Sequence, residues 1–248
     1  MQNTKPPITS VRSIRFRHDH TFSLFLKRTV SAQIHLFGLL LAAVGLGYLL
    51  YLTWNSPDRY QFWAATTFGV TSIMVFGTST LYHFLSDGLD LSESLSQLFE
   101  DLDHFSIYLF IAGTYTPVIL NTVKDESKLG MIALVWGIAI AGILYTHFKR
   151  RLPVWARHRF FSTGIFVAMG WLAVIKIQSI IANLSDLGFA ALVLGGLSYT
   201  VGAVIYASKR PILIKDIFGF HELWHVMVLG GFFFHYFVVL SFYRSLAG

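Results

Sequence analysis

Residues 30–54 read VSAQIHLFGLLLAAVGLGYLLYLTW, a stretch without a single Lys, Arg, Asp or Glu. Because about 20 apolar residues in a helix cross the hydrocarbon core of a bilayer, this stretch predicts a transmembrane helix. More apolar runs follow, and none of them shows the alternation of a β-barrel strand. The sequence therefore predicts an all-α membrane protein with seven transmembrane helices, at residues 30–54, 60–85, 104–123, 128–148, 160–181, 187–207 and 218–243.

The composition of the whole chain agrees with this prediction. Of the 248 residues, 54% are apolar and only 13% are charged, and the mean hydropathy is +0.59. An ordinary soluble domain carries about 25% charged residues, so the composition excludes both a soluble and a disordered protein. The chain divides into a basic tail at 1–29, a seven-helix domain at 30–243 and a short tail at 244–248.

The chain contains no Cys, which excludes disulfides, thiolate metal ligands and a thiol nucleophile. A metal site would therefore depend on His, Asp and Glu. The net charge of +6 is explained by basic loops on the cytoplasmic face. No nucleic-acid partner is expected, because the basic clusters lack the soluble domain that nucleic-acid recognition needs.

The distribution of Lys and Arg predicts the orientation in the membrane. The N-terminal tail and the loops that follow the second, fourth and sixth spans together hold 14 of these residues, and the other side holds five. We therefore expect the N-terminus in the cytoplasm and the C-terminus outside.

An acidic loop precedes the third span. In this loop Asp90 and Glu93 resemble a helix capping box. Leucine and phenylalanine then recur at helical spacing, which predicts a short interfacial helix or a simple amphipathic linker, through Leu91, Leu95, Leu98, Phe99 and Leu102.

Ionisable residues inside a membrane span are costly, so each is a candidate functional residue. With the predicted orientation, His83 ends the second span, Asp103 begins the third, and His221 and His225 begin the seventh, all near the cytoplasmic side. His35 and His235 are interpreted as core histidines. His104 is interpreted as a neighbour of the site, because adjacent helical residues point about 100° apart.

The spacing of these residues favours a metal. His221 and His225 lie one helical turn apart on one face, and His83 adds a third imidazole. Three His ligands with an open fourth position are typical of catalytic zinc. Ser79 shares the helix face of His83 and would orient a water or stabilise an oxyanion, while Asp103 would act as general base or water holder.

Haem binding and protease chemistry are two alternative roles for these histidines. Haem is disfavoured, because two ligands on one helix face cannot occupy opposite faces of the porphyrin. The stretch from His221 to His225 also fits the H-E-x-x-H motif, in which Glu222 would be the general base of an intramembrane metalloprotease.

Three stretches resemble the hemolysin III family, which is grouped with the progestin and adipoQ receptors: TLYH at 80–83, DHFSIYLFIAGTYTP at 103–117 and HELWH at 221–225. The resemblance implies zinc held by His83, His221 and His225, with Asp103 contacting the metal through water. It departs at the first span, where His35 is present but the acid and the Asn that precede it in the family are absent.

The resemblance also implies a function. It places the chain in a bacterial plasma or inner membrane, as a zinc-dependent hydrolase of a lipid amide or ester, similar to alkaline ceramidases. Three alternatives remain open: a non-enzymatic sensor of membrane state with structural zinc, a hemolysin-like pore, and the intramembrane metalloprotease. The expected partners are the membrane and a lipid substrate or ligand.

Overall fold

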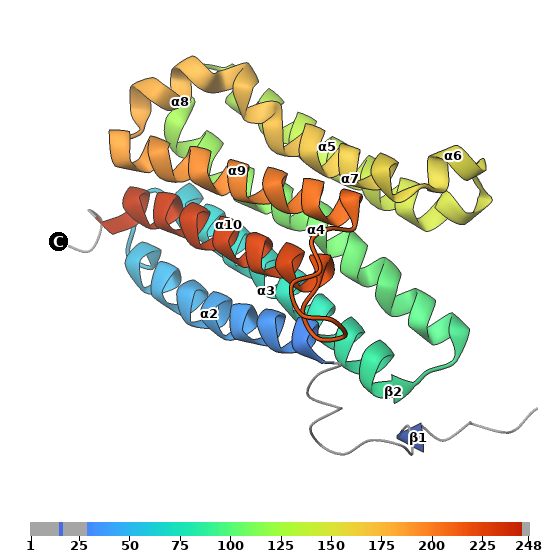
Figure 1. The fold of residues 1–248 in the computed structure, drawn as a ribbon. Helices are drawn as coiled ribbons and strands as arrows, with labels where there is room; N and C mark the ends of the chain where they lie inside the picture. The colour runs from blue at the N-terminus through green and yellow to red at the C-terminus, as the bar shows by residue number, and fades with distance from the viewer. Residues whose placement is uncertain (1–14, 17–28, 245–248) are drawn as a thin grey trace, which may run out of the picture.

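The computed structural model describes residues 15–16 and 29–244, with side chains described at 29–86 and 91–244. In this part of the chain, seven helical segments are long and apolar enough to cross a membrane (Figure 1). The prediction of a seven-helix all-α protein is therefore confirmed, while the orientation in the membrane stays a prediction. The division into tails and domain also stays a prediction, and most of the basic tail falls outside the described residues.

The elements follow one another with short connections. Two-residue strands, β1 and β2, pair antiparallel, and 3-10 turns, η1 and η2, follow α5 and α7. The bounds are β1 Arg15–Phe16, α2 Val30–Thr53, α3 Arg59–Gly88, β2 Leu89–Asp90, α4 Glu93–Thr122, α5 Ser127–Phe148, η1 Lys149–Arg151, α6 Val154–Arg157, α7 Arg159–Gly170, η2 Trp171–Lys176, α8 Ile177–Asn183, α9 Asp186–Ser208 and α10 Phe220–Tyr243.

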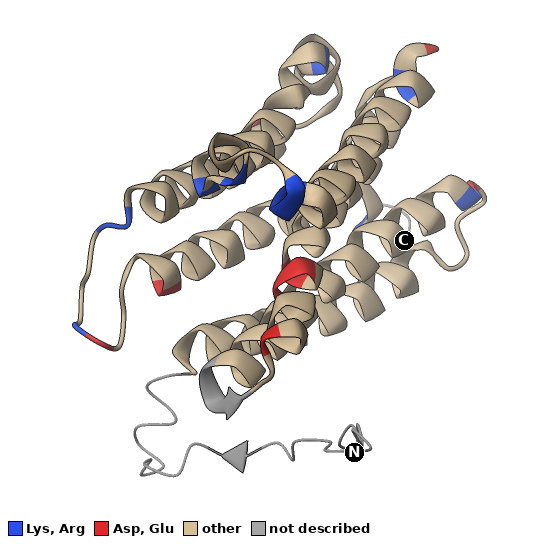
Figure 2. Cartoon of the chain, turned by 90° about the vertical axis from the view of Figure 1, so that its right-hand side faces the viewer, with Lys and Arg blue, Asp and Glu red and all other residues tan. Residues whose placement is uncertain are grey.

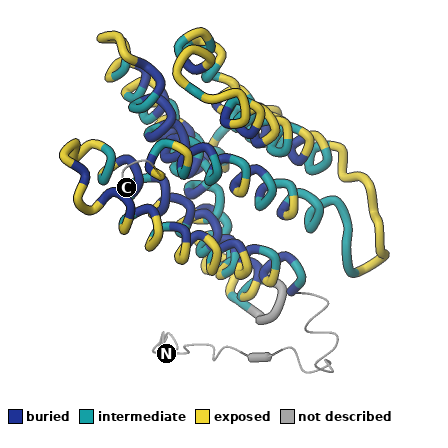
Figure 3. The backbone as a smooth tube through the Cα atoms, turned by 90° about the vertical axis from the view of Figure 1, so that its left-hand side faces the viewer, coloured by how far each residue is buried: buried dark blue, intermediate teal, exposed yellow. Residues whose placement is uncertain are grey.

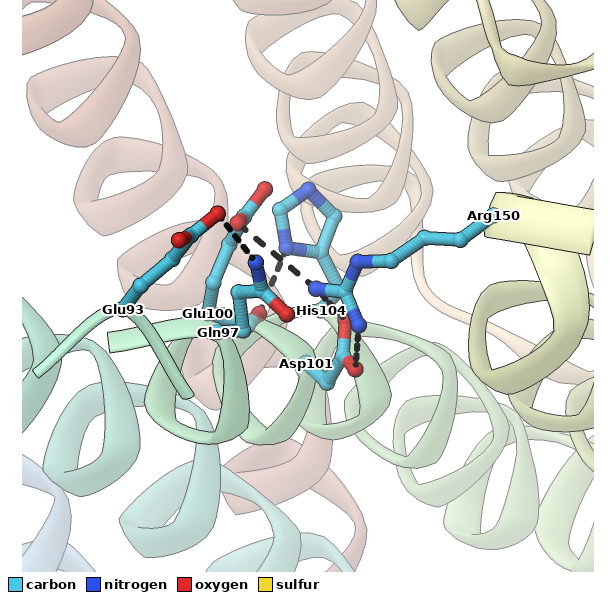
Figure 4. A network of polar contacts seen from close by, with 6 residues as sticks. All are labelled: Glu93, Gln97, Glu100, Asp101, His104 and Arg150. Carbon is cyan, nitrogen blue, oxygen red and sulfur yellow. Dashed lines mark hydrogen bonds and ion pairs between the residues drawn. The ribbon is translucent and has the colours of Figure 1, made fainter. Parts of the chain in front are cut away.

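The third span differs from its prediction. The prediction of a separate interfacial helix is wrong, because the acidic segment is the first part of α4, which begins at Glu93. The capping box is also wrong: Asp90 lies in β2, and the N-cap is Ser92, without a side-chain cap bond. Arg150 donates to both carboxylate oxygens of the buried Asp101, at 2.9 and 3.1 Å (Figure 4). This pairing neutralises a buried carboxylate within α4.

The helices form a bundle in which α4 and α10 occupy inner positions. α4 contacts α3, α5, α7, α8 and α10, and α10 contacts α2, α3, α4 and α9. Buried residues accordingly lie on the faces that meet inside the bundle, and exposed residues lie on the outer faces (Figure 3). The motif-bearing helices α3, α4 and α10 are therefore neighbours, although they are distant in sequence.

The fifth span is interrupted at membrane depth. It consists of α7, the 3-10 turn η2 and α8. Irregular backbone inside a membrane needs internal hydrogen-bond partners. Tyr115 on α4 supplies them: its hydroxyl donates to the carbonyl of Gly170 at 2.6 Å and accepts from the N–H of Ala173 at 2.7 Å.

The outer surface is that of a protein embedded in lipid. Charged residues gather at helix ends and loops, and the middle of the bundle is almost free of them (Figure 2). Exposed aromatic side chains lie at both ends, as expected at the two membrane interfaces. They include Tyr48, Tyr51, Trp54, Tyr60 and Trp63 at one end and Trp155, Phe160 and Phe161 at the other.

Candidate metal centre

Three imidazoles converge at one end of the bundle. His83 lies near the end of α3, and His221 and His225 lie in the first two turns of α10. The Nε2 atom of His83 is 3.2 Å from the Nε2 atom of His221 and 3.2 Å from that of His225. Each ring offers one nitrogen, and these three nitrogens all lie within 4.8 Å of one another. The three residues singled out by sequence are thus brought together and could hold a metal ion.

The distances between these nitrogens fit a tetrahedral ion. Zinc–nitrogen bonds of 2.0–2.1 Å in a tetrahedron place the ligand nitrogens about 3.3 Å apart. The two measured separations of 3.2 Å are close to this value. Two of the three rings, His83 and His225, are buried, which keeps them from bulk water. The donor set suits zinc or another ion that prefers imidazole.

Glu222 is not directed toward the imidazoles. Its Oε2 accepts from the backbone N–H of Gly219 at 2.8 Å and caps the start of α10. Its Oε1 accepts from the hydroxyl of Ser31 on α2 at 3.0 Å. Both carboxylate oxygens are therefore engaged in holding the end of α10. This arrangement argues against the role of general base that the H-E-x-x-H motif would assign to Glu222.

Ser79 and Asp103 lie beside the imidazoles. The Ser79 hydroxyl is buried one turn before His83 on α3. Asp103 on α4 and this hydroxyl border the same space as the ring of His225. Asp103 lines an internal cavity, which explains why its side chain is partly accessible although it lies inside the protein. Both predicted residues thus line the same space as His35 and His225.

His35 belongs to the same cluster, which corrects the prediction that it is a core residue apart from the site. Its Nε2 atom lies 2.7 Å from the Nδ1 atom of His225, and the ring is buried. A signal for this placement exists in the sequence. His35 lies one turn into the first span, so the topology that brings His83 and His225 together places His35 at the same end.

His104 and His235, the other two histidines singled out in the sequence, lie outside the cluster. Nδ1 of His104 is 2.8 Å from the carbonyl of Glu100, one turn back on its own helix (Figure 4). His235 is buried in the bundle, with Nε2 3.3 Å from the carbonyl of Leu192. These positions agree with the interpretation of His104 as a neighbour and of His235 as a core residue.

A cavity of about 200 Å³ adjoins the imidazoles. At its polar end it is lined by His35, Ser79, Asp103 and His225. Beyond them it is lined mostly by apolar side chains of α4, the fifth span, α9 and α10. Along α9 the lining residues run from 189 to 203, which corresponds to about 21 Å of helix. A polar group at the imidazoles and a long apolar chain could thus be bound together.

Comparison with known proteins agrees with the motifs on these helices. The family model described as haemolysin-III related matches residues 24–236, which include all four clustered histidines. The chain belongs to the haemolysin III family.

Relatives within and beyond bacteria share most of this length. The Hemolysin-3 homolog of Bacillus subtilis (strain 168) is 33% identical over 201 residues, 81% of this chain and 87% of that protein. Hemolysin-3 of Bacillus cereus is 36% identical over 178 residues, 71% of this chain and 74% of that protein. The human monocyte to macrophage differentiation factor is 26% identical over 225 residues, 88% of this chain and 86% of that protein. These similarities and the seven apolar helices identify an integral membrane protein.

Proposed function

We propose that this haemolysin III protein is a zinc-dependent hydrolase that cleaves an amide or ester bond in a membrane lipid. One observation carries the proposal: His225, one of the three converging imidazoles, lines a long and mostly apolar cavity inside the bundle. A polar lipid group would lie at the imidazoles and the apolar chain in the cavity. A zinc ion held by three imidazoles supplies Lewis-acid chemistry, by which it activates water and polarises a carbonyl group.

Residues of the chain would bind the metal, transfer the proton and stabilise the developing charge. His83, His221 and His225 would hold the metal. The carboxylate of Asp103 would accept a proton from the attacking water and return it to the leaving amine or alcohol as the bond to the carbonyl carbon breaks, because Asp103 lines the same cavity as His225. The hydroxyl of Ser79 donates a hydrogen bond to the oxygen on which negative charge develops. The apolar walls keep other water from the reacting bond.

The experiment combines metal analysis with lipid hydrolysis on the full chain in detergent. Wild type is expected to hold one zinc per chain and to hydrolyse a lipid amide, and His225→Ala is expected to lose both. The exposed His147 on α5 provides a control, because His147→Ala removes an imidazole that does not belong to the cluster and should leave both properties unchanged. A His225→Ala variant with full zinc content and full turnover would contradict the proposal.

A second candidate is a non-enzymatic protein in which zinc is structural. It is favoured by one observation: the three imidazoles come from two helices, so a metal would join α3 to α10. Asp103→Asn separates the candidates. If the protein is a hydrolase, this variant keeps its zinc and loses about 10²- to 10⁴-fold in turnover, the usual effect of removing a general base. If zinc is structural, wild type and Asp103→Asn bind zinc equally and neither turns over lipid.

The metalloprotease alternative predicts a different sensitive residue. Because Glu222 caps α10 and pairs with Ser31, we expect Glu222→Gln to retain most of the lipid hydrolysis. The amide of Gln keeps one acceptor oxygen for the cap. A loss of turnover comparable to that of Asp103→Asn, at unchanged zinc content, would restore Glu222 as the base.

A further inference from the structure

The contact between His35 and His225 is the shortest of those within the histidine cluster. The two ring nitrogens are 2.7 Å apart, against 3.2 Å for each of the other two contacts. The rings of His35 and His225 are nearly perpendicular, at 76°, with centroids 3.9 Å apart. Both side chains are buried, at 3% exposure each. The contact is therefore specific in direction and shielded from competing water.

The geometry assigns the direction of this hydrogen bond. The Nε2 atom of His225 lies 3.2 Å from Nε2 of His83 and would be the ligand atom of His225. A neutral imidazole that binds a metal through Nε2 carries its proton on Nδ1, and that N–H needs an acceptor. Nε2 of His35 is the atom at the required position. His35 thus accepts from His225 and carries its own proton on Nδ1.

A second contact supports the same pair of helices. Ser31 lies one turn before His35 on α2, and its hydroxyl donates to Glu222, which lies one turn before His225 on α10. The two contacts therefore join α2 to α10 at successive helical turns. Neither contact involves the nitrogen that faces the metal site. Together the two contacts fix the rotation of α10, the helix that carries His221 and His225.

We propose that His35 is a positioning residue of the metal centre, which fixes the tautomer and the ring orientation of His225 by accepting its Nδ1–H. Residues that hydrogen-bond to metal ligands in this way change metal affinity by about 10- to 100-fold when they are replaced. The inference rests on the metal centre of the proposed function. It does not depend on whether lipid is hydrolysed.

The test measures zinc affinity of the full chain in detergent by competition with a chromophoric chelator, and the absorption spectrum after Co²⁺ replaces zinc. His35→Gln keeps an acceptor oxygen at about the reach of Nε2. His35→Phe keeps a ring without an acceptor, and His35→Met keeps the length of Gln without an acceptor. His235→Phe is the matched control, since it replaces a buried histidine outside the cluster.

We expect about 10- to 100-fold weaker zinc binding and a changed Co²⁺ spectrum for His35→Phe and His35→Met. His35→Gln and His235→Phe should stay close to wild type. If one of the two variants without an acceptor fails to fold, the other still provides the comparison with His35→Gln. Equal affinities in the Gln and Met variants would overturn the inference, because ring packing alone would then explain the contact. A wild type that binds no metal would instead overturn the metal centre itself.

Discussion

Tyr115→Phe tests how the wall of the cavity is held together. The Tyr115 hydroxyl connects α4 to the interruption of the fifth span, by donating to the Gly170 carbonyl and accepting from the Ala173 N–H. All three residues line the cavity. At this depth neither lipid nor bulk water can replace the lost partners, so removal of one oxygen atom leaves backbone groups poorly satisfied.

The size of the effect follows from the two short contacts. A net hydrogen bond contributes about 0.5–1.5 kcal/mol in proteins, and polar contacts between transmembrane helices average about 0.6 kcal/mol. Two contacts of 2.6 and 2.7 Å therefore stabilise the fold by about 1–3 kcal/mol in total. The ring of Phe fills the same space, so no packing contribution is expected.

The assay is equilibrium unfolding of the full chain in mixed micelles, with hydrogen exchange read at the interruption. Tyr115→Phe should lose about 1–3 kcal/mol in free energy of unfolding and exchange faster at residues 170–177, because a locally weakened segment opens first. Tyr51→Phe is the control, since Tyr51 is 74% exposed. Zinc content should stay unchanged, because the three imidazoles lie on other helices. Equal stability and equal exchange in the two variants would refute the reasoning.

Three further predictions concern packing, charge and orientation. Gly113→Ala should lower the free energy of unfolding by about 1–3 kcal/mol, because the added Cβ would clash with the Thr71 hydroxyl. At Gly137 an added Cβ meets no atom within 4 Å, so Gly137→Ala should leave the free energy of unfolding unchanged or raise it slightly. Arg150→Ala should lower the free energy of unfolding by about 1–2 kcal/mol, because it leaves the buried carboxylate of Asp101 without its partner, although Arg150 itself is partly solvated. Arg157→Ala removes the same charge from an exposed position and should lower the free energy of unfolding by less than about 0.5 kcal/mol. Because the chain has no Cys, a single Cys can be introduced at Lys124 or at Arg157 and labelled in intact cells. A membrane-impermeant maleimide should label Lys124→Cys and not Arg157→Cys. The opposite pattern would contradict the predicted orientation.

Several features of the site could be predicted from the sequence because they are local. The four-residue spacing of His221 and His225 places both rings on one face of any helix that contains them. The alternation of spans then places His83 and Asp103 at the same end of the bundle. The same argument applies to His35, although a single histidine inside a span is more often a core residue, and the contact with His225 is what places it in the cluster.

Other features depend on contacts between distant parts of the chain. The acidic segment before the third span is part of α4, and its buried Asp101 is paired with Arg150 far along the sequence. The interruption of the fifth span lies inside a mostly apolar run, and Tyr115 forms hydrogen bonds with its backbone. No periodicity in either segment signals these partners.

The sequence by itself determined the number of spans, the class of fold and the histidines that share one end of the bundle, because a bilayer requires long apolar helices and makes each intramembrane polar residue conspicuous. Only the tertiary structure decided that Glu222 caps α10, that His35 contacts His225 and that a cavity adjoins the cluster. The physical reason is that hydrophobicity is a property of each segment. The direction of a side chain, in contrast, depends on how its helix is rotated against its neighbours, and that rotation is set by contacts among all the helices together.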